Sequence, residues 1–240
     1  GLEQSIEGLR VGIPKEFFSS HLNDGVAATV TAAIKELEAA GAVIVDVSLP
    51  STDLGVSTYY VIAPAEASAN LSRYDGVRYG YRCDSPSDLQ DLYLRSRTEG
   101  FGEEVKRRIL IGTFTLSAAS YDQYFMKAQQ VRRLITEEYQ SVLKDVDVIA
   151  GPSAPNTAFV LNDDSKSITD MYMEDVYTIG ANLAGLPAIS VPAGLVNGLP
   201  VGMQLIGSRF CEAQLLNIAH QFQRRTDWHS LTPDLEGLTG

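Results

Sequence analysis

Residues 181–194 read ANLAGLPAISVPAG, and residues 199–207 read LPVGMQLIG. These two stretches decide the fold. The apolar helical pattern that leads into them stops at Gly185, a residue type that commonly ends helices. Apolar, β-branched runs at 188–191 and 201–206 then predict two strands. A helix followed by two such strands is typical of an α/β sheet.

The amino-terminal part of the sequence predicts a βαβ unit. It has an apolar strand at 9–13, a helix at 24–40 with Asn23 or Asp24 as its N-cap, and a second strand at 42–47. Strands joined by a crossover helix are expected to be parallel, with a right-handed connection.

The middle of the chain is mostly helical, and its end returns to α/β order. The fold class predicted is therefore α/β, with a mixed β-sheet flanked by helices. No repeat or linker is visible, so residues 1–240 are expected to form a single compact unit. The remaining expected helices are 54–71, 87–97, 103–116, 121–143, 169–184 and 211–225, and a buried strand is expected at 146–150.

The composition bounds the function. The formal net charge is −11 and the pI is about 4.7, and such an acidic surface disfavours direct binding to nucleic acid. No apolar run reaches the roughly 18 residues of a membrane span, and no secretory signal is apparent. Cys83 and Cys211 lack metal-ligand spacing, so both are expected to be free thiols in a cytoplasmic protein without a metal site.

The usual signatures of a complete active site are missing. The sequence GPSAP at 151–155 does not form the GxSxG pattern of a nucleophile elbow. No phosphate-binding loop or dinucleotide fingerprint occurs, and the only histidines are His21, His220 and His229. We therefore assign no catalytic residue to this chain.

Longer motifs resemble the amidase signature family. They read RVGIPKE at 10–16, YYVIAPAEASANL at 59–71, RYDGVRYG at 73–80 and KRRILIGTF at 106–114, together with the stretches quoted first. Their order and content are most similar to one branch, the A subunits of glutamyl-tRNA(Gln) amidotransferases. The resemblance covers essentially all 240 residues and implies the C-terminal half of an amidase signature fold.

The resemblance implies that the catalytic residues and the substrate-binding residues lie on different halves of the fold. In the family, a lysine and two serines, one joined by a cis peptide, form the catalytic triad on the N-terminal half, and nothing in this chain matches them. Without a positioned nucleophile and base the covalent route has no first step, so the chain alone is expected to be inactive. The family binds free glutamine through a tyrosine, an arginine and an aspartate, which by motif fall on Tyr59, Arg108 and Asp175.

That assignment makes chemical sense, because a free amino acid carries a carboxylate for a guanidinium and an ammonium for a carboxylate. Tyr60 is a near-equal alternative to Tyr59, which could also be core packing. Arg108 could instead form an ordinary ion pair with Glu104 one turn back. Asp175 could simply be solvated on a helix flank. Because the helix at 103–116 is apolar nearly all round, it is predicted to be buried.

The function implied is glutamine hydrolysis that supplies ammonia for amidating Glu-tRNA(Gln) in protein biosynthesis. The implied partners are a B subunit, which would handle tRNA, ATP and Mg²⁺, and a small C subunit; no cofactor is expected in this chain. Two alternatives stay open: a fragment of a stand-alone amidase acting on another carboxamide, and a non-catalytic assembly module.

The segment 73–82 interleaves arginine with tyrosine, as RNA-contacting patches do. In an acidic chain we favour a structural loop whose arginines pair locally.

Overall fold

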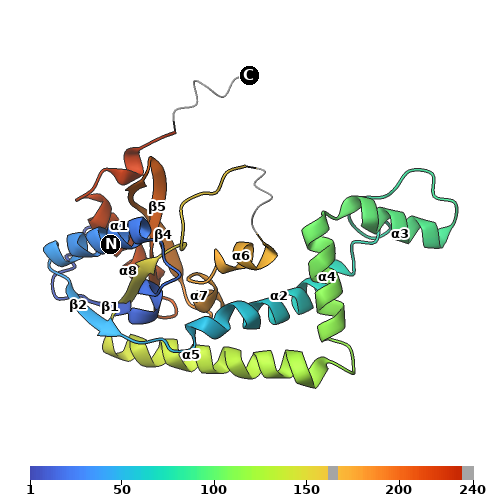
Figure 1. Ribbon diagram of the computed structural model, residues 1–240, viewed down its shortest axis with the longest axis horizontal. Helices are drawn as coiled ribbons and strands as arrows, with labels where there is room; N and C mark the ends of the chain where they lie inside the picture. Colours follow the sequence, from blue (N-terminus) through green and yellow to red (C-terminus); the bar gives the residue numbers. More distant parts are fainter. Residues whose placement is uncertain (162–166, 234–240) are drawn as a thin grey trace. The chain divides into compact units, whose positions relative to one another are not determined.

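The computed structural model describes residues 1–161 and 167–233 (Figure 1). Contacts between residues divide the chain into unit 1, Gly1–Val56 with Leu134–Gly240, and unit 2, Ser57–Arg133. This differs from the single compact unit expected over residues 1–240. Both boundaries fall inside continuous helices, so no glycine- or proline-rich linker marks them in the sequence.

The described part of unit 1 contains a five-stranded sheet, with strands β1 (Arg10–Pro14), β2 (Val43–Val47), β3 (Val148–Pro152), β4 (Ala188–Val196) and β5 (Leu199–Gly207). Their order is β2-β1-β3-β5-β4. β1 runs parallel to β2 and β3, whereas β5 runs antiparallel to β3 and β4. The mixed sheet and the parallel βαβ unit are therefore confirmed.

Two helices of unit 1, α1 (Asp24–Ala39) and α8 (Glu212–Gln223), pack on β4 and β5 (Figure 1). Asn23 is the N-cap of α1, since its side chain accepts hydrogen bonds from the backbone N–H groups of Gly25 and Val26. Apolar side chains are buried on both faces of the sheet. The largest fully buried ones include Phe17, Leu37, Ile149, Met203, Leu205, Ile206, Ile218 and Phe222.

The β4–β5 hairpin is longer than the strands expected at 188–191 and 201–206. Asn197 and Gly198 both have positive φ, of 51° and 80°, and Val196 pairs with Leu199 across them. An Asn-Gly pair in this conformation is the favoured two-residue turn between antiparallel strands. The turn therefore extends pairing beyond the apolar runs on which the prediction was based.

The single helix expected at 169–184 is two short helices, α6 (Ile168–Met173) and α7 (Ile179–Ala184), joined by a turn. The buried side chain of Gln204 donates hydrogen bonds through Nε2 to the carbonyl of Tyr177 (2.7 Å) and to that of Pro152 (3.0 Å). Between the two helices, the backbone N–H groups of Glu174, Asp175 and Val176 bond three residues back instead of four, so the α-helical pattern is interrupted there. Gly185 ends α7 with a φ of 67°, as predicted.

Unit 2 is helical. Gly112 on one of its helices faces Pro64 on another, and a Cβ at Gly112 would lie 1.9 Å from the Pro64 carbonyl oxygen. Only glycine allows such an approach of two backbones. The helices that lie in or cross unit 2 are α2 (Gly55–Leu71), α3 (Leu89–Gly100), α4 (Glu103–Thr115), a π-helical segment (Tyr121–Met126) and α5 (Lys127–Asp145). Short 3₁₀ helices in unit 1 cover Lys15–Phe18, Thr52–Leu54 and Trp228–Ser230.

The expected burial of the helix at 103–116 is wrong for one side of α4. Leu110 is 71% exposed and Phe114 is 56% exposed, whereas Gly112 and Thr115 are buried. Burial is confined to the side of α4 that approaches α2; on the opposite side Phe114 stays exposed although its ring meets that of Tyr124, with centroids 5.7 Å apart.

Candidate substrate-binding site

The site begins where α2 and α4 meet in unit 2. Arg108 lies one turn before Gly112, and Tyr59 precedes Pro64 on α2, so the close contact of the two backbones brings their side chains together. Nη1 of Arg108 donates a hydrogen bond of 3.3 Å to the hydroxyl of Tyr59. Two residues selected from the sequence are thus neighbours in the fold.

Tyr60 takes part as well. Its ring lies 5.6 Å from Cζ of Arg108, within range of a cation–π interaction. The rings of Tyr59 and Tyr60 meet edge to face, with centroids 5.0 Å apart and planes at 89°. The alternatives considered from sequence therefore both contact Arg108, one through its hydroxyl and the other through its ring.

Glu104 orients the arginine from the other side. Nε of Arg108 donates to Oε1 of Glu104 at 3.0 Å, and Arg107 forms an ion pair with Oε2 of the same carboxylate. Partial burial lowers the pKa of Arg108, but the hydrogen bonds with Glu104 and Tyr59 raise it by more, so the guanidinium stays charged. Partial burial raises the pKa of Glu104, and the two arginines lower it by more. The intrahelical ion pair proposed as an alternative is thus present.

This arrangement leaves part of the guanidinium available. Among the described residues no acceptor bonds to Nη2 of Arg108, and its side chain is 31% exposed. One carboxylate shared by two arginines leaves a net positive charge. A carboxylate ligand can therefore approach the two terminal nitrogens end-on and accept two parallel hydrogen bonds, a bidentate arrangement that strengthens Arg–carboxylate pairs.

Asp175 lies in the turn between α6 and α7, in unit 1, and is exposed. Its backbone carbonyl accepts hydrogen bonds from the N–H groups of Thr178 (3.0 Å) and Ile179 (3.1 Å), which begin α7. Because Asp175 and Arg108 belong to different units, the pairing of their charges around one ligand stays a prediction.

Unit 1 also holds a serine pair that sequence analysis did not select. The hydroxyls of Ser153 and Ser190 are 2.6 Å apart, next to Gly202, where a Cβ would come within 2.8 Å of either hydroxyl. Among the described residues, no amine, imidazole or carboxylate bonds to these hydroxyls, so nothing there activates a nucleophile. Ser190 lies within the strand expected at 188–191 and Ser153 lies three residues beyond the strand expected at 146–150, so only the cross-strand register of the sheet could have revealed the pair.

Within residues 1–161 and 167–233, no group of three or more His, Cys, Asp or Glu side chains is arranged to hold a metal ion. None of the helices in these residues combines the length and apolarity that crossing a bilayer requires.

The chain belongs to the amidase family: the family model described as Amidase matches residues 1–216. Relatives named as the A subunit of glutamyl-tRNA(Gln) amidotransferase are 58% identical in Nitrosococcus oceani and 60% identical in Saccharophagus degradans. Each comparison covers 97% of this chain and 48% of the relative, so the chain spans about half the length of the curated relatives it matches.

Solved structures agree on the fold. The crystal structure of the A subunit of glutamyl-tRNA(Gln) amidotransferase from Thermotoga maritima is 41% identical, with a TM-score of 0.73 over 97% of this chain and 46% of that one. Peptide amidase from Stenotrophomonas maltophilia is 23% identical, with a TM-score of 0.70 over 97% of this chain and 45% of that one, a likeness that shows the fold alone. The predicted resemblance to the C-terminal half of an amidase signature fold is thus confirmed as to family and fold.

Proposed function

We propose that this chain is the substrate-binding half of the glutamine-hydrolysing A subunit of a glutamyl-tRNA(Gln) amidotransferase. In this proposal glutamine gives up its side-chain amide as ammonia, which is used to convert Glu-tRNA(Gln) to Gln-tRNA(Gln). The observation that carries the proposal is Arg108, held on three sides by Tyr59, Tyr60 and Glu104, with its terminal nitrogens left for a ligand.

The chemistry of the ligand follows from that side chain. The carboxylate of glutamine would bind the terminal nitrogens of Arg108, with the Tyr59 hydroxyl at the rim as a further hydrogen-bonding group. Asp175 would accept the ammonium group and complete recognition of a zwitterion. The serine nucleophile and lysine base would come from polypeptide outside this chain, so these residues alone would bind glutamine without hydrolysing it.

The proposal extends to partners. A larger partner, the B subunit, would bind tRNA together with ATP and Mg²⁺, a small C subunit would complete the assembly, and the complex would act as a cytoplasmic ligase in protein biosynthesis. The formal net charge of −11 supports this division, because an acidic chain is a poor surface for tRNA and contact through the B subunit avoids the repulsion.

Titration calorimetry of the chain with L-glutamine and with propionamide tests the proposal. Glutamine should bind, while propionamide, which has the amide but neither charge, should not. Arg108→Ala should weaken glutamine binding by about tenfold or more, because charge-assisted hydrogen bonds contribute roughly 1.5–3 kcal/mol. Arg107→Ala is the matched control, since its guanidinium pairs with the same carboxylate, that of Glu104, from the neighbouring position on α4.

The rivals predict different results. Equal affinity for both ligands, unchanged by Arg108→Ala, would indicate a stand-alone amidase that recognises only the carboxamide. A non-catalytic assembly module would bind neither ligand but would still be captured specifically by B and C subunits. Either result rejects the glutamine pocket.

A further inference from the structure

A second recess lies within unit 2, where the last turn of α2 meets the loop that follows it. It has a volume of about 450 Å³ and is lined by Ala69, Asn70, Arg73, Tyr74 and Tyr79. Small-ligand pockets are on the order of 300–1,000 Å³. The recess is therefore large enough for one small molecule or one planar group of a larger one.

The loop is held in one conformation by its own polar groups. The carboxylate of Asp75 accepts hydrogen bonds of 2.9 Å from the backbone N–H groups of Val77 and Arg78, and of 2.9 Å from Nε of Arg78. Gly76 has a φ of 78°, and a Cβ there would lie 2.5 Å from Oγ of Ser96, so this turn requires glycine.

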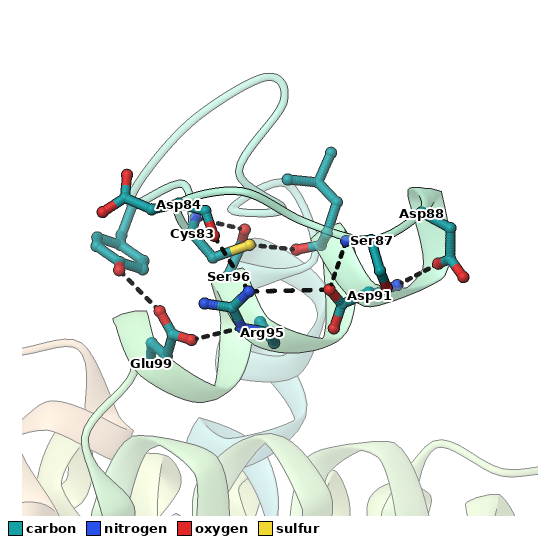
Figure 2. Close-up of polar contacts among 10 residues, drawn as sticks. Cys83, Asp84, Ser87, Asp88, Asp91, Arg95, Ser96 and Glu99 are labelled. Carbon is teal, nitrogen blue, oxygen red and sulfur yellow. Dashed lines mark hydrogen bonds and ion pairs between the residues drawn. The ribbon is translucent and has the colours of Figure 1, made fainter.

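The end of the loop is fixed on α3, as Figure 2 shows. Cys83 donates its backbone N–H to Oγ of Ser96 at 3.1 Å, and Nη1 of Arg95 donates to the carbonyl of Asp84 at 3.1 Å (Figure 2). Ser87 donates its N–H to Asp91 at 2.8 Å (Figure 2). A ligand would meet a preformed surface and would not bear the entropic cost of ordering the loop.

This rigid loop displays aromatic rings to solvent. Tyr74 is 46% exposed and Tyr79 is 58% exposed, and their ring centroids lie 6.0 Å apart at the recess. Rigid, exposed tyrosines next to an arginine have the composition of binding hot spots. Such rings provide a flat surface on which another planar group can stack.

Arg73 supplies charge. Arg78 is paired with Asp75, and Arg82 donates to the carbonyl of Gly76, as the local-pairing interpretation expects. Among the described residues, however, no acceptor bonds to the guanidinium of Arg73. The local-pairing interpretation therefore holds for two arginines of the segment and fails for the one that lines the recess.

The surroundings reinforce a positive potential. Nη1 of Arg97 donates to the carbonyls of Leu71 (2.9 Å) and Tyr74 (3.0 Å), which offsets the negative end of helix α2. Asp75, the carboxylate of the loop that lies nearest to Arg73 in the sequence, is already engaged by Arg78. A chain with a net charge of −11 thus has a local site that favours an anion.

We propose that this recess binds a nucleotide, with its base stacked on the ring of Tyr79 or Tyr74 and its phosphate on Arg73. An apolar ligand would leave Arg73 unused, and a simple anion would leave the rings unused; a nucleotide uses both. The amide of Asn70, which is exposed at the same recess, can hydrogen bond to a base edge. The inference does not rest on the proposed function, because it involves other residues and a binding event that needs no hydrolysis.

Calorimetry of the chain with adenosine 5′-monophosphate, with adenosine and with a short single-stranded RNA tests the site. The nucleotide should bind saturably, and adenosine, which lacks the phosphate, should bind about tenfold more weakly. Arg73→Ala and Tyr79→Ala should each weaken nucleotide binding by about tenfold, whereas Tyr79→Phe, which keeps the ring, should not. Lys35→Ala on α1, with the same change in charge, is the control and should have no effect.

The same measurements distinguish a free nucleotide from a nucleotide within RNA as the ligand. Binding of RNA that is lost in Tyr79→Ala, with no measurable binding of the free nucleotide, would support the site and assign it to RNA. RNA binding that depends on salt and ignores Tyr79→Ala would overturn the proposal, since it would reflect charge alone. Oligoglutamate, an anion without a base, serves as a further control. If it binds as tightly as the nucleotide, or if no probe binds saturably, the proposal is also overturned. Far-UV circular dichroism of each variant confirms that it is folded.

Discussion

Replacing Gly112 by alanine should destabilise unit 2 and loosen the contact between Arg108 and Tyr59. A Cβ at position 112 would lie 1.9 Å from the carbonyl oxygen of Pro64 and 2.8 Å from Cβ of Ser68. To reach even 3.0 Å from that oxygen, the backbones of α2 and α4 must separate by about 1.1 Å. No side-chain rotamer can relieve the contact, because the obstacle is main chain.

The size of the effect follows from two opposing contributions. Overpacking costs about 1–3 kcal/mol, and a rigid obstacle places Gly112→Ala near the upper end of that range. Alanine gains about 1 kcal/mol over glycine from helix propensity. The net expectation is a loss of about 2 kcal/mol in the stability of unit 2.

Hydrogen exchange of the amides in α2 and α4 measures this loss, since it reports the opening of unit 2 separately from unit 1. Thr113→Ala is the matched control, because the same residue is introduced one position away on the exposed side of α4. It should raise protection slightly through helix propensity, by about 0.5 kcal/mol. Glutamine affinity should fall in Gly112→Ala alone. If Gly112→Ala protects α4 as well as Thr113→Ala does, the close approach of the two helices is not what positions Arg108.

Two further predictions concern polar groups that stabilise the fold. Gln204→Leu should lower the free energy of unfolding by about 2–4 kcal/mol, because the buried carbonyls of Pro152 and Tyr177 both lose their hydrogen-bond donor. Urea unfolding measures this loss, and the control Gln214→Leu on α8 should leave the free energy of unfolding nearly unchanged. Hydrogen bonds from the Arg78 and Val77 backbone lower the pKa of Asp75 from 3.8 to about 2 in the folded chain. Its contribution to stability is therefore complete above the unfolded pKa and is lost as pH falls through the folded one, so the stability difference between the wild type and Asp75→Asn should vanish near pH 2. An NMR titration that gives this carboxyl an ordinary pKa would contradict the second prediction.

The sequence pattern predicts an element correctly where local preferences alone determine the structure. The βαβ unit, the N-cap at Asn23 and the helix stop at Gly185 follow from local preferences, and the structure confirms them. The helix expected at 169–184 is interrupted by a turn at residues 174–178, where Gln204, some twenty residues later in the chain, bonds to the carbonyl of Tyr177. A polar residue between the apolar Met203 and Leu205 was the available signal, because a buried amide must find partners.

The division of the chain into two units could not be predicted from the sequence, because no sequence signal marks the boundaries. Boundaries are usually sought in flexible, polar segments, but here they fall within α2 and α5, whose helical patterns continue through them. For α4 the sequence predicted too much burial. Its apolar residues Leu110 and Phe114 indicated a buried helix, yet the packing that buries α4 involves the side that carries Gly112.

For the candidate site, the sequence leaves two roles open for Arg108, as an ion-pair partner of Glu104 or as a ligand-binding residue, because a helical wheel counts neighbours and does not distinguish donors. The structure shows the ion pair, and its geometry leaves room for a ligand. In the structure Glu104 takes Nε, Tyr59 takes one N–H of Nη1, and Tyr60 covers the face of the guanidinium. The ion pair thus reduces the freedom of the side chain without using the nitrogens that a carboxylate needs. An arginine held in this way loses less conformational entropy on binding, so its intrahelical ion pair strengthens the case for a binding site.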